Sequence, residues 1–550
     1  MTAGFELPLA EGHIQHRASA ARILGPPWAH LPTLTIGLLG VQILWSVEMA
    51  YAPPYLLSLG LSKSAMAMVF LAGPLSGLVV QPVVGVLADN STSRWGRRRP
   101  YMLAGCTLCA ASMLVLGYTR QVAAIFTGRG NHANDLAARW LAVLAIYVID
   151  FSVNAVQAVD RALLVDILPF EMQASGNAWA AAMLGLGSLV GFFVGNLNLP
   201  ELLPFLGSSE LQVLSVLVVV LIVTGHFTTA VLVREGVVVT APEHRRQSLR
   251  AEIHQIFASM RTLPRVIKQI FMVQFFAWLG WFPVLLYTTT YISDLYARSI
   301  PATSVLQTPT EIAEEGTRLG SRALFFSAIL ALLTNLVLPA FASTASSKSS
   351  MKTSIPKLPL PTIWAFSHLL FGVCMLATFA VSSVSGATFI IAIAGVSWAV
   401  AQWAPFALLA EAILTSKVAN TIRDSHLNNE VDPLLDADGV RDAESVDLTD
   451  EFERLDMRSP SLLTDNIIDP EDGLGSKAGV ILGIHNVCIV IPQFLVTILC
   501  AVVFALFDSD GASGGTNGSE ANKPSSVIYV FRLGAVWSFV AFMISRRMAQ

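Results

Sequence analysis

Long apolar runs separated by short polar stretches dominate this sequence. A helix that crosses a membrane needs about 20 mostly apolar residues. Runs of that kind are found at residues 31–58, 64–88, 100–118, 139–163, 177–196, 211–233, 269–293, 320–341, 361–383, 387–414, 478–507 and 526–545. The pattern therefore predicts an all-α membrane protein with about twelve transmembrane helices.

The composition agrees with a protein that is solvated mostly by lipid. Of the 550 residues, 54% are hydrophobic and 13% are charged, whereas a soluble chain has about 25% charged residues. The net charge of −4 gives no indication of a nucleic-acid partner. All five cysteines lie in apolar runs, which favours packing roles. A redox or metal role for the Cys106-x-x-Cys109 pair remains an alternative.

The distribution of Arg and Lys predicts the orientation of the chain. Positive residues gather after the second, sixth and eighth spans and in the C-terminal tail, which all lie on one side if the span count is right. They include Arg94, Arg97, Arg98 and Arg99, then Arg234, Arg245, Arg246, Arg250, Arg261, Arg265 and Lys268, then Lys348, Lys352 and Lys357, and finally Arg546 and Arg547. Both termini are therefore predicted to be cytoplasmic. Asn517 would then be an outer glycosylation site, whereas Asn90 would face the cytoplasm and stay unmodified.

The basic loop after the sixth span divides the chain into two halves of six helices. We expect a cytoplasmic N-terminal tail at 1–30, an N-terminal half at 31–233, a basic cytoplasmic linker at 234–268 and a C-terminal half at 269–550. Residues 416–477 are acidic and poor in aromatics, which predicts a disordered cytoplasmic insert. Transporters with two such halves bind substrate between them, near the bilayer midplane.

Two acids lie near the centres of the predicted spans, Glu48 in the first and Asp150 in the fourth. Each is about eleven residues, or about 16 Å, from the outer end of its span, so the two acids should lie at similar depth. A charge at mid-membrane costs about 2.5–3.5 kcal/mol and needs a reason. Two acids facing one cavity suit a proton-coupled carrier. The alternative is a protonated acid that is hydrogen-bonded between helices.

Span four carries Asp150, Asn154, Gln157 and Arg161 at the spacing i, i+4, i+7, i+11. These positions lie on one face of a helix and form a polar stripe that must line a cavity or a partner helix. Arg161 is about 16 Å from Asp150 along the axis, too far for a direct ion pair. It is placed to donate hydrogen bonds to substrate hydroxyls or to an acid on another helix.

The second half offers aromatic rings near amides. Span seven has Trp278 and Trp281, and span ten has Gln402 and Trp403. Rings and amides together suit a sugar, although each ring can equally be a packing residue. Span eleven adds Asn486 and His485, and the histidine is either a helix-to-helix hydrogen bond or a titrating group.

Several motifs resemble the sucrose–proton symporters, a family of the glycoside-pentoside-hexuronide:cation symporter type within the major facilitator superfamily. The longest match runs from Gly73 to Gly85, followed by Asp89 and by Arg94-Trp95-Gly96-Arg97-Arg98-Arg99-Pro100. Further matching segments are Gly40-Val41-Gln42, Arg161-Ala162-Leu163-Leu164, Trp281-Phe282-Pro283, and Asn486 with Ile489-Val490-Ile491-Pro492-Gln493. The resemblance thus extends over both halves.

This resemblance implies a major facilitator fold, proton symport and a glucosidic disaccharide as cargo. It implies that Asp150 carries the proton and that Arg161 binds substrate, with Gln42 as a further candidate. Asp89 would pair with an arginine of the Arg94, Gly96, Arg97, Arg98 loop to close the inward gate. Glu48 and Lys63 differ from the plant carriers, which have Gln and His there, and Thr288 and Thr290 replace plant acids. Glu48 and the two threonines are more similar to the fungal branch, which includes maltose and sucrose carriers, and the glutamate is also similar to the animal relatives.

We therefore expect a proton-coupled importer of sucrose or maltose that works by alternating access. It would need no cofactor besides the coupling proton, no metal, no nucleic acid and no oligomer, and it would not be an enzyme, since no catalytic constellation is found. The plasma membrane is the expected location, with the vacuolar membrane as an alternative. Two other functions stay open: a sugar sensor without net transport, with the acidic insert as its signalling segment, and a carrier of another small solute.

Overall fold

The computed structural model describes residues 22–89, 91, 93–169, 172–235, 263–300, 308–343, 358–430, 478–508 and 525–548, without the side chains of Val86, Asp89, Ala174, Ala340, Ser343, 414–430, 478–480 and Leu482. The predicted glycosylation site Asn517, the unmodified Asn90 and most of the acidic insert lie outside the described residues.

Twelve helical segments within the described residues are long and apolar enough to cross a membrane. This confirms the predicted all-α membrane fold. The α-helices are α1 His30–Ser58, α2 Lys63–Val69, α3 Ala72–Asp89, α4 Arg99–Gly117, α5 Thr119–Thr127, α6 His132–Ile167, α7 Gln173–Val194, α8 Leu199–Leu202, α9 Glu210–Leu232, α11 Arg265–Ser299, α12 Pro309–Val337, α13 Leu360–Ala377, α14 Val384–Glu430, α16 Ala478–Asp508 and α17 Ser526–Met548.

The remaining elements are short. Single 3-10 turns precede α1 and follow α12, at η1 Pro27–Ala29 and η3 Leu338–Phe341. Strands β1 Arg22–Ile23 and β2 Val233–Arg234 pair antiparallel, and β3 Ala342–Ser343 pairs parallel with β4 Leu358–Pro359. The first pair joins the start of α1 to the end of α9, so it ties the two ends of the first half together.

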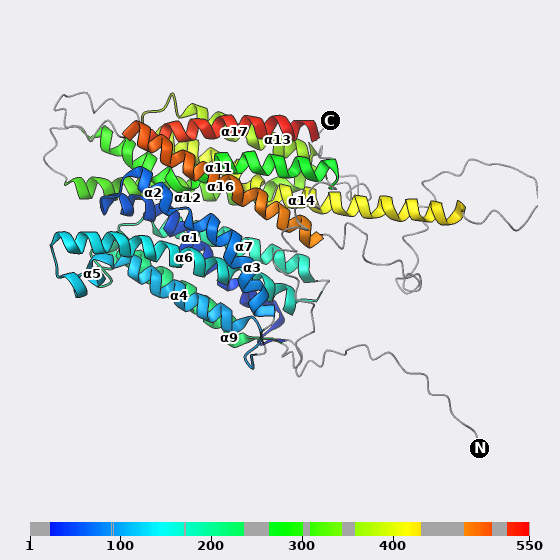
Figure 1. Ribbon diagram of the computed structural model, residues 1–550, viewed down its shortest axis with the longest axis horizontal. Helices are drawn as coiled ribbons and strands as arrows, with labels where there is room; N and C mark the ends of the chain where they lie inside the picture. The colour runs from blue at the N-terminus through cyan, green and yellow to red at the C-terminus, as the bar shows by residue number, and fades with distance from the viewer. Residues whose placement is uncertain are drawn as a thin grey trace, which may run out of the picture.

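The helices form two bundles, as Figure 1 shows. In the first, α1 packs on α7 and α9, and α4 packs on α6 and α9. In the second, α11 and α13 pack on α17, and α12 packs on α14. Contacts between the bundles run through α2 and α16, α1 and α11, and α7 and α12. A substrate held between the bundles would therefore meet side chains from both halves of the chain.

Small residues let α1 and α7 approach closely. A Cβ added at Gly187 would lie 2.8 Å from Cβ of Gln42, and one added at Gly191 would lie 2.7 Å from Cβ of Ser46. Glycines four residues apart on one helix face allow backbone contact in membranes, where lipid provides no hydrophobic drive between helices. The stem of Gln42, a candidate substrate ligand, therefore packs against α7.

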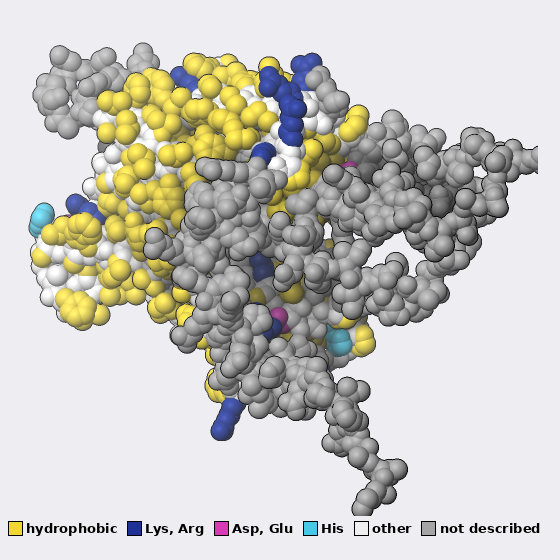
Figure 2. All heavy atoms as spheres, turned by 45° about the vertical axis from the view of Figure 1, so that its right-hand side comes forward, with side chains coloured by type: hydrophobic (Ala, Val, Ile, Leu, Met, Phe, Trp, Pro, Cys, Tyr) yellow, Lys and Arg dark blue, Asp and Glu magenta, His cyan; other side chains and the backbone are white. Residues whose placement is uncertain are grey.

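Apolar side chains cover much of the helical body where the described surface is visible (Figure 2). Leu144, Phe227, Leu336 and Phe366 are among the large hydrophobic residues that are more than half exposed. A soluble protein rarely exposes such a continuous apolar surface. An apolar exposed surface of this kind is typical of helices that cross a membrane.

The second span differs from the single helix expected at 64–88. It is broken into α2 and α3 at Phe70 and Leu71. Pro74 has no N–H, so it cannot donate the helical hydrogen bond to the carbonyl of Phe70. The chain therefore ends α2 with a turn and restarts with Pro74 in the first turn of α3.

The eighth span begins eleven residues earlier than the apolar run at 320–341 indicated, because α12 starts at Pro309. Thr308 and Glu311 form a capping box, in which each side chain accepts from the backbone N–H of the other residue. This cap starts the helix in a polar segment that hydropathy alone does not mark.

The helix α14 continues to Glu430, so residues 416–430 are helical where we expected disorder. No Gly or Pro occurs between Pro405 and Glu430. A helix that is already nucleated in the membrane gains one hydrogen bond for each residue it adds, so extension is easy. Residues 431–477 lie outside the described residues.

Candidate functional site

The structure brings the two predicted membrane acids together. Glu48 on α1 is 5% exposed and Asp150 on α6 is 7% exposed, and their carboxyl groups are close enough to interact electrostatically. Within the described part of the chain, neither carboxyl group makes a hydrogen bond. Buried carboxyls that have no fixed partner are free to bind a proton or a ligand.

One face of α3 packs against α6 at Asp150. A Cβ added at Gly73 would lie 3.7 Å from Oδ1 of Asp150, so the carboxyl lies against a helix surface without a side chain. Three residues further along α3, Oγ of Ser76 donates a 2.7 Å hydrogen bond to the main-chain oxygen of Asp150. The residues of the Gly-Pro-Leu-Ser-Gly segment thus position the acid.

Asn154 belongs to the same hydrogen-bond network. Its Nδ2 donates to the main-chain oxygen of Asp150 at 2.9 Å, and its Oδ1 accepts from Nε2 of Gln81 at 2.8 Å. Both polar atoms of the Asn154 amide are therefore used inside the protein. Asn154 thus joins α6 to α3 through Gln81, and its predicted role in substrate binding stays a prediction.

The rest of the polar stripe faces different surroundings. Gln157 is buried and Arg161 is exposed. Within the described residues Arg161 makes no ion pair, so its guanidinium group is available to a ligand. The neighbouring Asp160 points away from the stripe and forms a buried hydrogen bond with His226 of α9, with 3.1 Å between Oδ2 and Nε2.

Two of the predicted aromatic candidates of the second half, Trp278 and Trp281, form one cluster, whereas Trp403 packs elsewhere in the second bundle. The ring of Trp281 stacks on Phe371 at 4.0 Å between centroids and lies 5.1 Å from Trp398. Trp278 meets the same Trp398 edge to face at 6.1 Å. Trp281 of α11 is 5% exposed and packs against α13 and α14. Trp278 is more accessible.

His485 makes the helix-to-helix hydrogen bond that was one of its two expected roles. Its Nε2 lies 3.1 Å from Nε2 of Gln274, which joins α16 to α11. The ring of Phe406 lies edge to face with His485, with 4.9 Å between centroids. His485 is 2% exposed and therefore belongs to the packing of the second bundle.

Asn486 and the span-ten candidates lie on α16 and α14. Gln402 is exposed, and Trp403 and Asn486 are half-buried. Val490, one helical turn after Asn486, has Cγ2 at 3.9 Å from the position of a Cβ added at Gly77. This contact places the Asn486 face of α16 against the α3 surface that holds Asp150.

The arginines of the loop between α3 and α4 pair with an acid that we had not predicted as their partner. Arg97 binds both carboxylate oxygens of Asp166, with Nη2–Oδ1 at 2.5 Å and Nε–Oδ2 at 3.1 Å. Nε of Arg98 adds a 2.8 Å bond to Oδ2. Arg94 is exposed. The side chain of Asp89 lies outside the described atoms, so its expected pairing stays a prediction.

Glu235 is a further residue that sequence reasoning missed. Its carboxylate accepts the backbone N–H groups of Arg97, Arg98 and Arg99 at 2.8–2.9 Å and so caps the start of α4. Gly96 has φ +104°, and a Cβ there would lie 2.6 Å from Oε1 of Glu235, so only glycine fits. The sequence did contain a feature that could have identified Glu235: it is the first acidic residue after the sixth span.

Ser76 and Gln81 were also missed as site residues, although both lie inside the motif that carried the family resemblance. With Gly73 and Gly77 they recur at i, i+3, i+4 and i+8, one face of a helix. This helical periodicity was the sequence feature that could have identified Ser76 and Gln81 as site residues. The acid that this face of α3 contacts depends on how the helices pack.

Comparison with known proteins places the chain in a family. The model of the Major Facilitator Superfamily matches residues 34–422, which is more than half of the chain. The chain belongs to the Major Facilitator Superfamily. This confirms the family predicted from the motifs, and the relatives of this chain in the superfamily are transporters.

Individual relatives narrow the comparison. The General alpha-glucoside permease of Schizosaccharomyces pombe is 31% identical over 93% of this chain and 92% of its own length. The Sucrose transport protein SUT3 of Oryza sativa subsp. japonica is 28% identical over 56% of this chain and 63% of its own length. A bacterial homolog of the human lysosomal transporter Spinster shares the fold, with a TM-score of 0.55, 12% identity and coverage of 96% of this chain and 97% of its own.

Proposed function

We propose that this protein imports an α-glucoside, sucrose or maltose, together with a proton. The similarity to an alpha-glucoside permease over nearly the full length of both chains supports the substrate class. The sucrose transport proteins support the same class over a shorter stretch. The buried pair of Glu48 and Asp150 carries the proposal of proton coupling, because two neighbouring carboxylates in a membrane interior repel each other when both are ionised.

In the proposed cycle the two bundles alternate access to a site between them. With the outer end open, Asp150 takes up a proton and a sugar binds between the bundles. The loaded protein rocks inward, releases the sugar and returns the proton to the cytoplasm. Arg161 donates hydrogen bonds to sugar hydroxyls, and Trp278, Gln402 and Asn486 supply a ring face and amides. The proton is the only coupling ion in this cycle.

The driving force is sufficient for accumulation. One proton supplies about 2.3 kcal/mol per 100 mV of membrane potential and about 1.4 kcal/mol per pH unit. Together these hold a neutral sugar at a gradient of roughly several hundredfold, since each 1.4 kcal/mol is a factor of ten. A carrier with one titrating site therefore accounts for uphill import.

Uptake by a host that lacks disaccharide carriers tests the proposal. Labelled maltose and sucrose are supplied at acidic and neutral pH, with and without an uncoupler, and surface expression is measured in parallel. We expect concentrative uptake that acid stimulates and the uncoupler abolishes. If neither sugar enters cells that show the protein at the surface, the proposal fails, and a sensor or a carrier of another solute takes its place.

We also place the protein in the plasma membrane with both termini in the cytoplasm. The Arg and Lys residues of the loops after α3, α9 and α12 support this orientation. Epitope tags at each end, stained before and after permeabilisation of the cells, test it. A tag stained on intact cells would reverse the assignment.

A further inference from the structure

Polar contacts at the predicted outer end of the bundles join the two halves. Among the described residues, Nζ of Lys63 lies 2.9 Å from Oδ2 of Asp294, and Nε of Arg322 lies 2.7 Å from Oδ1 of Asn196. Nε of Arg318 lies 3.5 Å from Oε1 of Glu210. Each of these pairs has one member in the first bundle and one in the second. They therefore hold this end closed.

The ion pair of Lys63 and Asp294 lies where the ends of α2, α11 and α17 meet. Lys63 is the first residue of α2, directly after the N-cap Ser62, and Asp294 lies near the end of α11. Oγ of Ser525, just before α17, donates a 2.5 Å hydrogen bond to the same Oδ2 that binds Lys63. The Lys63 and Asp294 side chains are 19% and 27% exposed. The ion pair is thus partly shielded but still reached by water.

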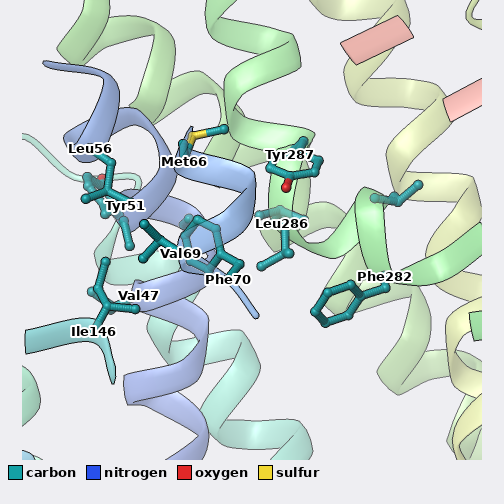
Figure 3. Close-up of a cluster of buried hydrophobic side chains, with 14 of the residues drawn as sticks. Val47, Tyr51, Leu56, Met66, Val69, Phe70, Ile146, Phe282, Leu286 and Tyr287 are labelled. Atoms are coloured by element: carbon teal, nitrogen blue, oxygen red, sulfur yellow. The ribbon is translucent and has the colours of Figure 1, made fainter. Parts of the chain in front are cut away.

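An apolar layer lies directly beneath this pair. Met66 and Phe70 of α2 face Leu286 and Tyr287 of α11 in Figure 3, and all four side chains are buried in one cluster that spans both bundles. Lys63 lies three residues before Met66 and seven before Phe70, and Asp294 lies seven residues after Tyr287, which is about 4.5–10 Å along their helices. The charges therefore lie on the outer side of a closed apolar seam.

We propose that Lys63 and Asp294 form an outer latch, an ion pair that stabilises the closed outer end and must break in every cycle before sugar can enter. The inference rests on the alternating-access function proposed above and extends it to residues outside the central site. A partly exposed ion pair shifts an equilibrium between two states by only about fivefold. Such a latch biases the closed state without locking it.

Cysteine accessibility measures the latch without any sugar. A reporter, Met66→Cys, is placed in the apolar layer and labelled in intact cells with a membrane-impermeant maleimide. Lys63→Glu puts two acids face to face, so we expect the labelling rate of the reporter to rise by about fivefold. The same rise is expected for Asp294→Lys, and the combined exchange of both charges should return the rate to its original level.

The matched control is Arg120→Glu, which breaks an exposed ion pair with Asp135 inside the first bundle at the same end. It should leave reporter labelling unchanged. The native cysteines are buried except for the half-buried Cys488, and the chain without the reporter measures their background. Equal labelling rates in wild-type, Lys63→Glu and Asp294→Lys backgrounds would overturn the latch.

Cross-linking gives a second test that does not depend on how charge reversal affects folding. Lys63→Cys with Asp294→Cys is joined by a short, reducible bifunctional thiol reagent. We expect sugar uptake to fall more than tenfold and to return on reduction, whereas each single variant stays active. Full uptake after complete cross-linking would contradict the latch. If labelling responds as expected but neither sugar is taken up, the cargo proposal fails and the latch stands.

Discussion

Ser76 of α3 donates a 2.7 Å hydrogen bond to the main-chain oxygen of Asp150 on α6. The bond is buried and joins residues that are 74 positions apart. Because the Ser76 hydroxyl binds the main-chain oxygen, it does not occupy the carboxyl group of Asp150. The acid is thus held at a fixed place between helices while its side chain remains available for proton exchange.

Loss of that hydrogen bond should weaken the coupling of proton and sugar transport while the protein still folds. In Ser76→Ala the Asp150 carbonyl keeps its bond from Asn154, so we expect a loss of about 1 kcal/mol in stability and a lower accumulation ratio of labelled sugar. The control Ser58→Ala removes an exposed bond within α1. Accumulation in Ser76→Ala equal to that control would contradict a positioning role.

Neutralising Asp150 should abolish uphill uptake. Asp150→Asn keeps the size of the side chain but removes the carboxyl, so no proton is carried with the sugar. The internal-to-external ratio of labelled sugar should then fall to about one or below, since a factor of ten needs about 1.4 kcal/mol of coupled energy. The exposed Asp135→Asn serves as the control. Undiminished accumulation in Asp150→Asn would rule out the proton assignment.

The arginine network between α4, α6 and α9 should depend on Asp166. Asp166→Asn leaves Arg97 and Arg98 without their carboxylate, and loss of charged hydrogen bonds costs about 1.5–3 kcal/mol. We expect a lower melting temperature of the purified protein and slower uptake. Arg94→Ala, at an exposed position of the same loop, should leave the melting temperature unchanged. Similar melting temperatures for Asp166→Asn and wild type would show that the network adds no stability.

Close helix packing in the first bundle makes Gly40 irreplaceable. A Cβ at Gly40 would lie 2.7 Å from Cα of Ile222, a backbone atom that cannot move aside easily. Gly40→Ala should force α1 from α9 and cost about 1–3 kcal/mol. At Gly85 nothing lies within 4 Å of an added Cβ, so Gly85→Ala is the control. Expression and thermal stability of the two variants should differ, and equal values would refute the packing argument.

The sequence pattern predicted the spans well but their ends less well. Every predicted span has a counterpart among the twelve of the structure. The predicted span ends are wrong where a proline or a helix cap, and not the hydropathy of the residues, sets where a helix begins or ends. Pro74 breaks the second span, and the capping box at Thr308 starts α12 in a polar segment. In α14 an established helix continues past the apolar run.

The surroundings of the candidate residues were visible in the sequence only in part. The stripe on span four identified Asp150 and Asn154, but the partners Ser76 and Gln81 come from α3. The loop motif identified Arg97, whereas its acid Asp166 lies 69 residues away. Trp281, for which ligand binding and packing were both open, stacks on Phe371 of α13. In each case the residue type was visible in the sequence and the partner was not.

The sequence by itself determined the membrane fold, its two halves of helices and the unusual acids within it. The reason is physical: in lipid every backbone polar group must be satisfied within the segment, so an apolar run of sufficient length has to be a helix. Only the tertiary structure decided that Ser76 binds the main-chain oxygen of Asp150, that Glu235 caps α4 and that Lys63 pairs with Asp294. Those contacts depend on how each helix is rotated and packed against the others, and local periodicity does not contain that information.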